Sequence, residues 1–226
     1  MKIFITLFFI GNSDSYKVRA ILILFASLSY NYQLKAQSYL LDKSKNASFV
    51  SASIGSDDWA VYKTAAIGYS VNGRFDMVLA GIYESGSTAK AYTITPALSY
   101  LVVKQDKLPL SIGLFAGYGF KNFNHTKDLK NYTIKTGISL YHKIKIRNNV
   151  LLIPGLFCGQ DFTKTRLDDY TNRFSTRSAG IQTTLLIKNF SITPQFSYTQ
   201  LRGSLFTLQA GLILFKSEFI QPVNEL

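Results

Sequence analysis

Apolar and polar residues alternate along most of the chain from about residue 47 onward. The stretch 64–84 shows this most clearly, because Asn72-Gly73 separates two alternating runs. Asn-Gly between such runs predicts a two-residue hairpin, since a type I′ turn needs positive φ at both central residues. One side of the two strands is mostly apolar and aromatic, with Ala65, Ile67, Tyr69, Val71, Phe75, Met77, Leu79, Gly81 and Tyr83. The other side is small or polar.

The same pattern recurs to the end of the chain, where no helical period competes with it. Ten strands are expected, over residues 47–55, 60–71, 74–84, 89–103, 109–121, 131–147, 149–163, 176–187, 190–200 and 204–216. Eight strands are the alternative, because the first strand and the crowded run 150–162 alternate least clearly. The connections between the strands alternate between short polar turns and longer polar segments such as 122–131 and 164–177. This alternation predicts a meander with its tight turns at one end.

Two architectures are compatible with strands of this kind. A soluble β-sandwich turns its apolar faces inward and uses strands of roughly five or six residues. A transmembrane barrel turns them toward lipid and needs about 9 to 11 residues per strand. The predicted strands reach this greater length, and aromatic residues recur at the ends of the apolar face: Tyr69, Phe75, Tyr83, Tyr92, Tyr100, Tyr118, Phe120, Tyr132 and Tyr198. We therefore expect an antiparallel up-and-down transmembrane β-barrel, with a secreted soluble β-sandwich as the alternative.

The N-terminal segment resembles an export signal. Residues 17–19 are Lys-Val-Arg, residues 20–28 are almost wholly apolar, and Ala36 ends a stretch resembling a signal-peptidase site. The apolar run is too short to span a bilayer comfortably. We expect residues 1–36 to be an export segment and residues 37–226 to form the barrel domain. A retained inner-membrane anchor is the alternative, and an upstream start site or a long signal would explain residues 1–16.

Composition narrows the classes of function. The chain has 226 residues, of which 47% are hydrophobic and 17% charged, with a formal net charge of +12. The cations are scattered, and neither a basic run nor a phosphate-binding loop accompanies them, so nucleic acid is not expected as a partner. The single cysteine, Cys158, excludes an intramolecular disulfide framework; with only two histidines a Cys/His zinc cluster is not expected, and neither is a cofactor.

Together these features resemble the small outer-membrane β-barrel proteins of the porin-like superfamily of Gram-negative bacteria. The resemblance covers residues 38–216 and rests on the export signal, the amphipathic hairpins and the final strand 205–215, LFTLQAGLILF. That strand resembles the C-terminal signal for outer-membrane assembly, although Phe215 falls on the opposite face from the apolar set and residues 216–226 follow it. The resemblance implies an outer-membrane location and the outer-membrane assembly machinery as a partner; we expect a monomer.

The predicted lumen face carries charges of both signs. The candidate network consists of Asp76, Glu84, Lys135, Lys143 and Lys145. A barrel of eight strands is just wide enough for side chains to fill, and ten leave slightly more room, so these charges are expected to pair and plug the interior. The alternatives are that Lys143 and Lys145 only solvate the periplasmic rim, and that a narrow pore for small solutes remains.

Catalysis is not expected from the available residues. Barrels resembling this one include outer-membrane proteases and lipid A deacylases, which would need His125 with Asp128, or the pair Asp168-Asp169, in a catalytic role. His125 and Asp128 are expected in a solvated loop, and arginines surround the acid pair, which favours exposed salt bridges. His142 is expected on the lipid-facing set near the periplasmic end.

Positive charge is concentrated in two predicted external loops. One contains Lys164, Arg166, Arg173 and Arg177, and the other contains Lys121, Lys127 and Lys130. Cations attract anionic lipid head groups, and outer-leaflet lipopolysaccharide carries phosphates. The sequence thus favours a structural or binding protein whose basic external loops contact lipopolysaccharide and outer-membrane lipid, with a solvated loop as the alternative.

Overall fold

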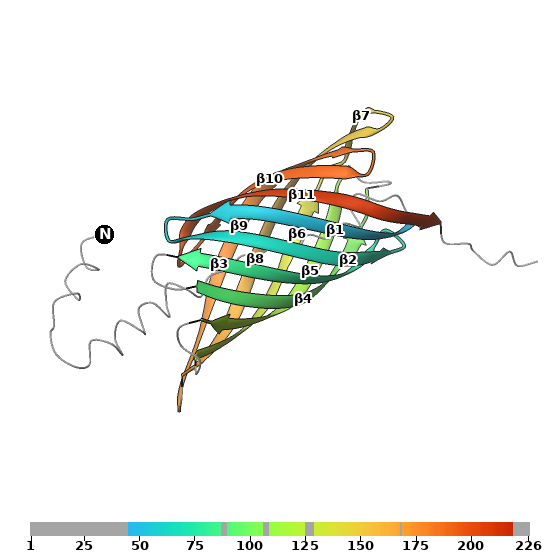
Figure 1. Ribbon diagram of the computed structural model, residues 1–226. Helices are drawn as coiled ribbons and strands as arrows, with labels where there is room; N and C mark the ends of the chain where they lie inside the picture. Colours follow the sequence, from blue (N-terminus) through green and yellow to red (C-terminus); the bar gives the residue numbers. More distant parts are fainter. Residues whose placement is uncertain (1–44, 87–89, 106–108, 125–128, 168, 219–226) are drawn as a thin grey trace, which may run out of the picture.

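The chain forms one antiparallel β-sheet that closes on itself (Figure 1). The computed structural model describes residues 45–86, 90–105, 109–124, 129–167 and 169–218. Its strands are β1 (Lys45–Ser56), β2 (Ala60–Val71), β3 (Phe75–Gly86), β4 (Lys90–Val103), β5 (Ser111–Phe123), β6 (Leu129–Tyr141), β7 (Ile144–Arg147), β8 (Val150–Leu167), β9 (Tyr170–Ile187), β10 (Phe190–Thr199) and β11 (Gly203–Glu218). Consecutive strands pair with one another, except that β6 pairs with β8 and not with β7, and β1 pairs with β11.

The barrel has ten strand positions, because β6 and β7 share one of them. The β6–β8 pairing ends at Tyr141 opposite Gly155, and the β7–β8 pairing starts at Ile144 opposite Leu152. The prediction of ten strands is therefore confirmed, and the alternative of eight is wrong. The predicted strand 131–147 is interrupted at residues 142–143.

The two faces of the sheet follow the predicted alternation. Large apolar side chains point outward and stay exposed, as with Ile67 at 58% and Ile181 at 56%, while Thr95 and Ser197 on the inner face are fully buried. A soluble protein would bury the apolar set, so the β-sandwich alternative is excluded. A closed sheet with an apolar exterior satisfies its backbone hydrogen bonds in lipid, where an open edge is not viable. This is the architecture of a transmembrane barrel.

The predicted hairpin turn has the geometry that its sequence requires. Asn72 has φ of 54° and Gly73 has φ of 55°, as a type I′ turn needs. The side-chain oxygen of Asn46 accepts a 2.8 Å hydrogen bond from the backbone N–H of Asn72, which joins the turn to the start of β1. The short turn 188–189 lies at the same end, with Lys188 at φ 54°.

The first and last described strands meet at one end of the barrel, where Lys45 lies opposite Glu218. In an outer-membrane barrel with an even number of strands this is the periplasmic end, and the other is extracellular. The predicted contrast between tight turns and long loops is weaker than expected. Residues 164–177 were predicted as a loop, but β8 continues to Leu167 and β9 begins at Tyr170. Their polar outer side chains lie on strands that project beyond the apolar band, where an apolar face is no longer needed.

Apolar side chains fill the periplasmic end of the lumen. The cluster consists of Ala47, Leu101, Tyr141, Ile153, Leu186 and Ile213, with Leu151 packed against it. A smaller cluster of Ala91, Phe123 and Leu129, with Leu167 and Phe174, lies at the extracellular end. Inward rings also approach glycines of neighbouring strands, as Phe115 does over Gly137. The lumen is thus packed by side chains at both ends.

No helix within the described residues is long and apolar enough to cross a membrane. The predicted export segment 1–36 lies outside the described residues.

Candidate functional site

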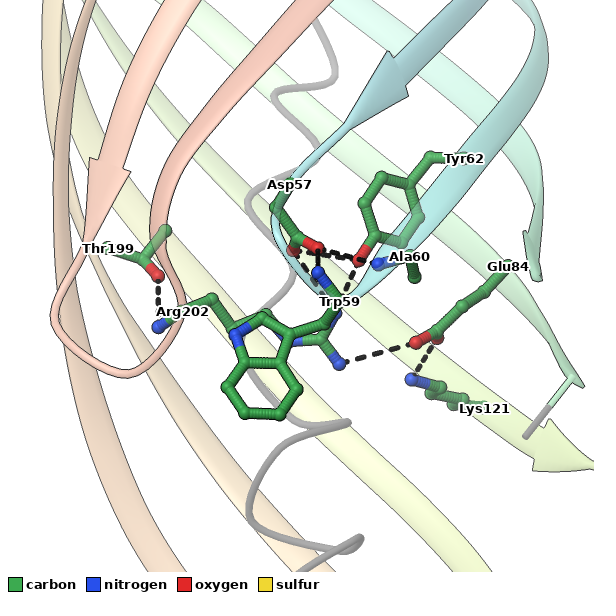
Figure 2. Close-up of polar contacts among 8 residues, drawn as sticks. All are labelled: Asp57, Trp59, Ala60, Tyr62, Glu84, Lys121, Thr199 and Arg202. Carbon is green, nitrogen blue, oxygen red and sulfur yellow. Dashed lines mark hydrogen bonds and ion pairs between the residues drawn. The ribbon is translucent and has the colours of Figure 1, made fainter. Parts of the chain in front are cut away.

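A buried group of charges lies at the extracellular end of the lumen (Figure 2). Arg202, in the β10–β11 turn, is at its centre: Nη1 lies 3.4 Å from Asp57 Oδ2 and Nη2 lies 3.2 Å from Glu84 Oε1. Arg202 also donates a 2.5 Å hydrogen bond from Nη1 to the hydroxyl oxygen of Tyr62. Glu84 forms a second ion pair, with Lys121 on β5. This arginine therefore joins the β10–β11 turn to three other parts of the barrel.

The turn residues are themselves held by local hydrogen bonds. Asp57 Oδ1 accepts from the backbone N–H groups of Trp59 and Ala60, both at 2.8 Å, and its Oδ2 accepts from the Tyr62 hydroxyl at 2.8 Å. The backbone N–H of Arg202 donates to Thr199 Oγ1 at 3.0 Å. These hydrogen bonds hold the Asp57 carboxylate and the backbone of Arg202 in position for their ion pair.

Charge and burial define what this group can do. It contains two carboxylates and two cations, so the cluster is neutral, and the Arg202 side chain is only 3% exposed. Buried charges persist when they are paired and hydrogen-bonded, as these are. The described charges of this group pair with one another at the extracellular end of the lumen.

Two further polar contacts lie deeper in the lumen. Lys135 on β6 pairs with Asp161, directly opposite on β8, at 3.1 Å between Nζ and Oδ2. The hydroxyl of Ser99 donates a 3.1 Å hydrogen bond to Asp76, whose side chain is fully buried. Charged and polar side chains therefore occupy the lumen between its two apolar clusters.

The predicted lumen network is brought together only in part. Asp76, Glu84 and Lys135 face the lumen and are buried, each with a different partner. Lys143 lies in the break between β6 and β7, and its backbone N–H donates to the Gln105 side chain. Lys145 is exposed in β7, at the periplasmic rim. Both lysines therefore lie toward the periplasmic end of the barrel.

Sequence reasoning missed four members of the buried group. Asp57 and Arg202 lie in turns that are 145 residues apart in sequence, so alternation carries no signal for their contact. Tyr62 and Lys121 both lie on the predicted lumen face, and this position is the one feature of the sequence that indicates their place in the group. Lys121 was instead expected in an external loop, and this prediction is wrong because β5 continues to Phe123 and turns the lysine inward.

A group of cations lies on the outer face of the barrel at the extracellular end. Lys164 lies directly opposite Arg173, and Lys130 lies directly opposite Arg166. Arg177 lies four residues further toward the membrane on β9, opposite Gln160. All five side chains are exposed and point away from the lumen. We call this set the outer basic patch; it comprises Lys130, Lys164, Arg166, Arg173 and Arg177.

Aromatic residues mark the boundary between this patch and the apolar band. Tyr132 lies opposite Lys164 on the neighbouring strand. Its ring packs against Phe120 and Tyr118, with centroids 5.4 and 6.4 Å apart. Amphipathic rings prefer the membrane–water interface. The outer basic patch therefore begins at the level where lipid head groups are expected.

The residues considered for catalysis do not form a described site. His125, Asp128 and Asp168 lie outside the described residues. His142 contacts the backbone oxygen of Pro109 at the periplasmic end, while Asp169 is exposed at the extracellular tip of the β8–β9 hairpin. Within the described ranges, no group of three or more His, Cys, Asp or Glu residues could hold a metal ion.

No family model matches the chain, and no curated protein matches it. Solved structures resemble it at low identity. The attachment invasion locus protein Ail of Yersinia pestis is 12% identical, over 78% of this chain and 100% of that one, with a TM-score of 0.39. The KdgM porin in complex with oligogalacturonate is 9% identical, over 74% and 99%, with a TM-score of 0.42. LpxR from Salmonella typhimurium is 10% identical, over 82% and 86%, with a TM-score of 0.41.

The closed sheet, the exposed apolar band and the polar lumen of this chain define a small outer-membrane β-barrel protein of the Gram-negative envelope. Its function is argued from its own residues.

Proposed function

We propose that this protein is a non-conducting outer-membrane barrel that binds the phosphorylated head groups of outer-leaflet lipopolysaccharide. The observation that carries the proposal is the outer basic patch, in which five cations from three neighbouring strands share one exposed face. Because the patch adjoins the aromatic boundary of the apolar band, its cations lie where lipid phosphates lie. A water-exposed loop would not hold its charges at this level.

The chemistry of the patch suits phosphate. Three of its five residues are arginines, whose planar guanidinium groups bind phosphate oxygens through two parallel hydrogen bonds. Each cation near an anionic membrane surface contributes about 1 kcal/mol of attraction. Such contacts weaken as salt screens the charges. We therefore expect lipopolysaccharide binding that weakens with ionic strength.

The filled lumen supports the non-conducting part of the proposal. The neutral group around Arg202 occupies the extracellular end, and the apolar cluster around Leu101 and Ile153 occupies the periplasmic end. A solute would have to displace both. A narrow pore would need a path between the side chains at both of these ends.

Charge reversal at two opposing positions tests the binding. The double variant Lys164→Glu with Arg173→Glu is expected to bind lipopolysaccharide at least about tenfold more weakly, because two attractive charges become repulsive. The matched control is Lys145→Glu with Arg147→Glu, which makes the same charge change at the periplasmic end. Affinity of the detergent-refolded proteins for fluorescent lipopolysaccharide measures both. Equal affinities of wild type and the patch variant would contradict the proposal.

A further inference from the structure

Strand β9 has strand neighbours on both sides for only part of its length. Its pairing with β8 runs from Ile187 to Tyr170, the full strand. Its pairing with β10 ends at Ser178, opposite Thr199. Residues 170–177 therefore extend past β10, and no described strand lies on that side of them. Figure 1 shows the β8–β9 hairpin projecting beyond the rest of the barrel.

The direction of the backbone groups along this segment follows from one hydrogen bond. The backbone oxygen of Arg177 accepts from the N–H of Gln200 at 3.1 Å, so the Arg177 backbone points toward the β10 side. The lateral direction of backbone N–H and C=O groups alternates from one strand residue to the next. The backbone groups of Ser175, Arg173 and Thr171 therefore point to the same side, past the end of β10. They form an open edge, and we call these three residues the β9 edge.

Most of the β9 edge lies beyond the apolar band, because Phe162 on β8, directly opposite Ser175, is the last exposed apolar side chain on the outer face of that strand. The side chains of Thr171, Arg173 and Ser175 are polar and exposed on the outer face, whereas the apolar band on β9 reaches only to Ile181 and Ala179. An unpaired edge is not viable in lipid, but it is in water. This edge is thus a row of hydrogen-bonding groups that faces the extracellular medium.

We propose that the β9 edge binds an extended peptide segment of an extracellular protein, which adds to the barrel as an antiparallel strand. Exposed sheet edges bind peptides in this way, with backbone hydrogen bonds for affinity and alternate side chains for selectivity. On the outer face, the added strand would lie beside Arg173, which favours an acidic side chain at the facing position. On the inner face it would lie beside Phe174, which packs in the extracellular apolar cluster and favours apolar side chains. The expected ligand alternates acidic and apolar residues.

Charge also argues against self-association at this edge. Two copies pairing edge to edge in antiparallel fashion about Arg173 would bring Arg173 of one copy beside Arg173 of the other. Like charges at facing positions of paired strands are destabilising. An acidic peptide relieves this repulsion, so it is the better occupant.

A synthetic peptide of alternating glutamate and valine, about seven residues long and fluorescently labelled, is the probe. In an antiparallel pair, two residues that lie opposite each other have their side chains on the same face of the sheet. The glutamates of the peptide would therefore lie opposite the β9 edge residues, and their backbone N–H and C=O groups would form the hydrogen bonds to that edge. N-methylation of the glutamates is expected to abolish binding to the full chain refolded in neutral detergent, whereas N-methylation of the valines leaves it intact. Failure of the unmethylated peptide to bind, or equal effects of the two methylation patterns, would overturn the proposal.

A variant of the protein tests the same edge without changing charge. Ser175→Pro removes one N–H donor, at a position where an edge strand tolerates proline. Peptide affinity is expected to fall about fivefold, as for one lost hydrogen bond. Ser175→Ala, which keeps the N–H, is expected to bind like wild type. Unchanged gel mobility of unboiled Ser175→Pro establishes that it has folded, and unchanged peptide affinity in that folded variant would overturn the proposal.

The peptide-binding and lipopolysaccharide-binding experiments test the two proposals separately. Ser175→Pro keeps every cation of the outer basic patch, so its lipopolysaccharide affinity is expected to equal that of wild type. Loss of peptide binding with intact lipopolysaccharide binding would support the edge proposal even if charge reversal at Lys164 and Arg173 had no effect on lipopolysaccharide.

Discussion

Arg202 is the residue on which the polar contacts at the extracellular mouth converge. Its guanidinium contacts Asp57, Tyr62 and Glu84, and its backbone is tied to Thr199. Removing one partner of a buried ion pair costs more than the pair contributes, because the remaining charge is left without compensation. The stability of this end of the barrel should therefore depend on one turn residue.

We expect Arg202→Ala to lower the free energy of unfolding by about 3 to 5 kcal/mol, since the buried Asp57 carboxylate loses its described cation and Glu84 keeps only Lys121. Urea unfolding of the refolded barrel, followed by tryptophan fluorescence, measures this. Adding Asp57→Asn to Arg202→Ala should recover part of the loss, because the carboxylate left without its cation is then removed while Glu84 stays paired with Lys121. A loss below about 1 kcal/mol for Arg202→Ala would mean that the buried group does not hold the mouth closed.

Glycines on the lumen face make room for inward rings. A Cβ at Gly137 would meet the ring of Phe115 and the backbone oxygen of Cys158, whereas a Cβ at Gly81, on the outer face, would meet nothing within 4 Å. We expect Gly137→Ala to destabilise the barrel by about 1 to 3 kcal/mol, as overpacking does. Gly81→Ala is the control and should unfold like wild type in the same titration. Similar stabilities of the two variants would contradict the lumen packing described.

At the scale of elements, the break between β6 and β7 is closed by a side chain. Gln105 donates from Nε2 to the backbone oxygen of Lys143 at 3.0 Å, and its Oε1 accepts from the Lys143 N–H at 2.5 Å. The amide group therefore takes the place of a strand partner where β6 ends. It anchors the start of β7, which pairs with β8 alone among the described strands.

Replacing this amide should loosen β7 locally. In Gln105→Ala we expect faster backbone hydrogen exchange in residues 144–147 and faster trypsin cleavage after Arg147, with little change in the rest of the barrel. Gln200→Ala, in the turn at the opposite end, is the matched control because only its backbone makes a described contact. Equal exchange rates in β7 for the two variants would contradict the role given to Gln105.

The number of strands and the outward or inward direction of their side chains were predictable, because apolar and polar residues alternate wherever one face of the sheet meets lipid. The predicted strand ends were wrong beyond the apolar band, where one face of the sheet no longer meets lipid: Lys164 and Arg173 were expected in a loop, yet they lie on strands. The group around Arg202 was not predictable for a different reason. Barrel closure brings the β10–β11 turn beside the β1–β2 turn, and no local pattern encodes that distance.

At the scale of the whole molecule, different kinds of side chains occupy the two ends of the lumen, and we propose that together they close it. A buried group of paired charges lies at the extracellular end and an apolar cluster lies at the periplasmic end. We expect no steady conductance from the wild type in planar bilayers. Arg202→Ala alone should also stay non-conducting, because the cluster around Leu101 and Tyr141 is untouched. Steady ohmic currents through the wild type would contradict the filled lumen.

The account depends most on the claim that the apolar face meets lipid, and the single cysteine of the chain can test it. Cys158 is exposed on the outer face of β8, between Leu156 and Gln160, within the apolar band. A fluorophore attached to Cys158 in reconstituted vesicles should be quenched by lipids that carry a quencher in their acyl chains, and not by aqueous iodide. Quenching by iodide without quenching by the lipids would place this face in water and contradict the account.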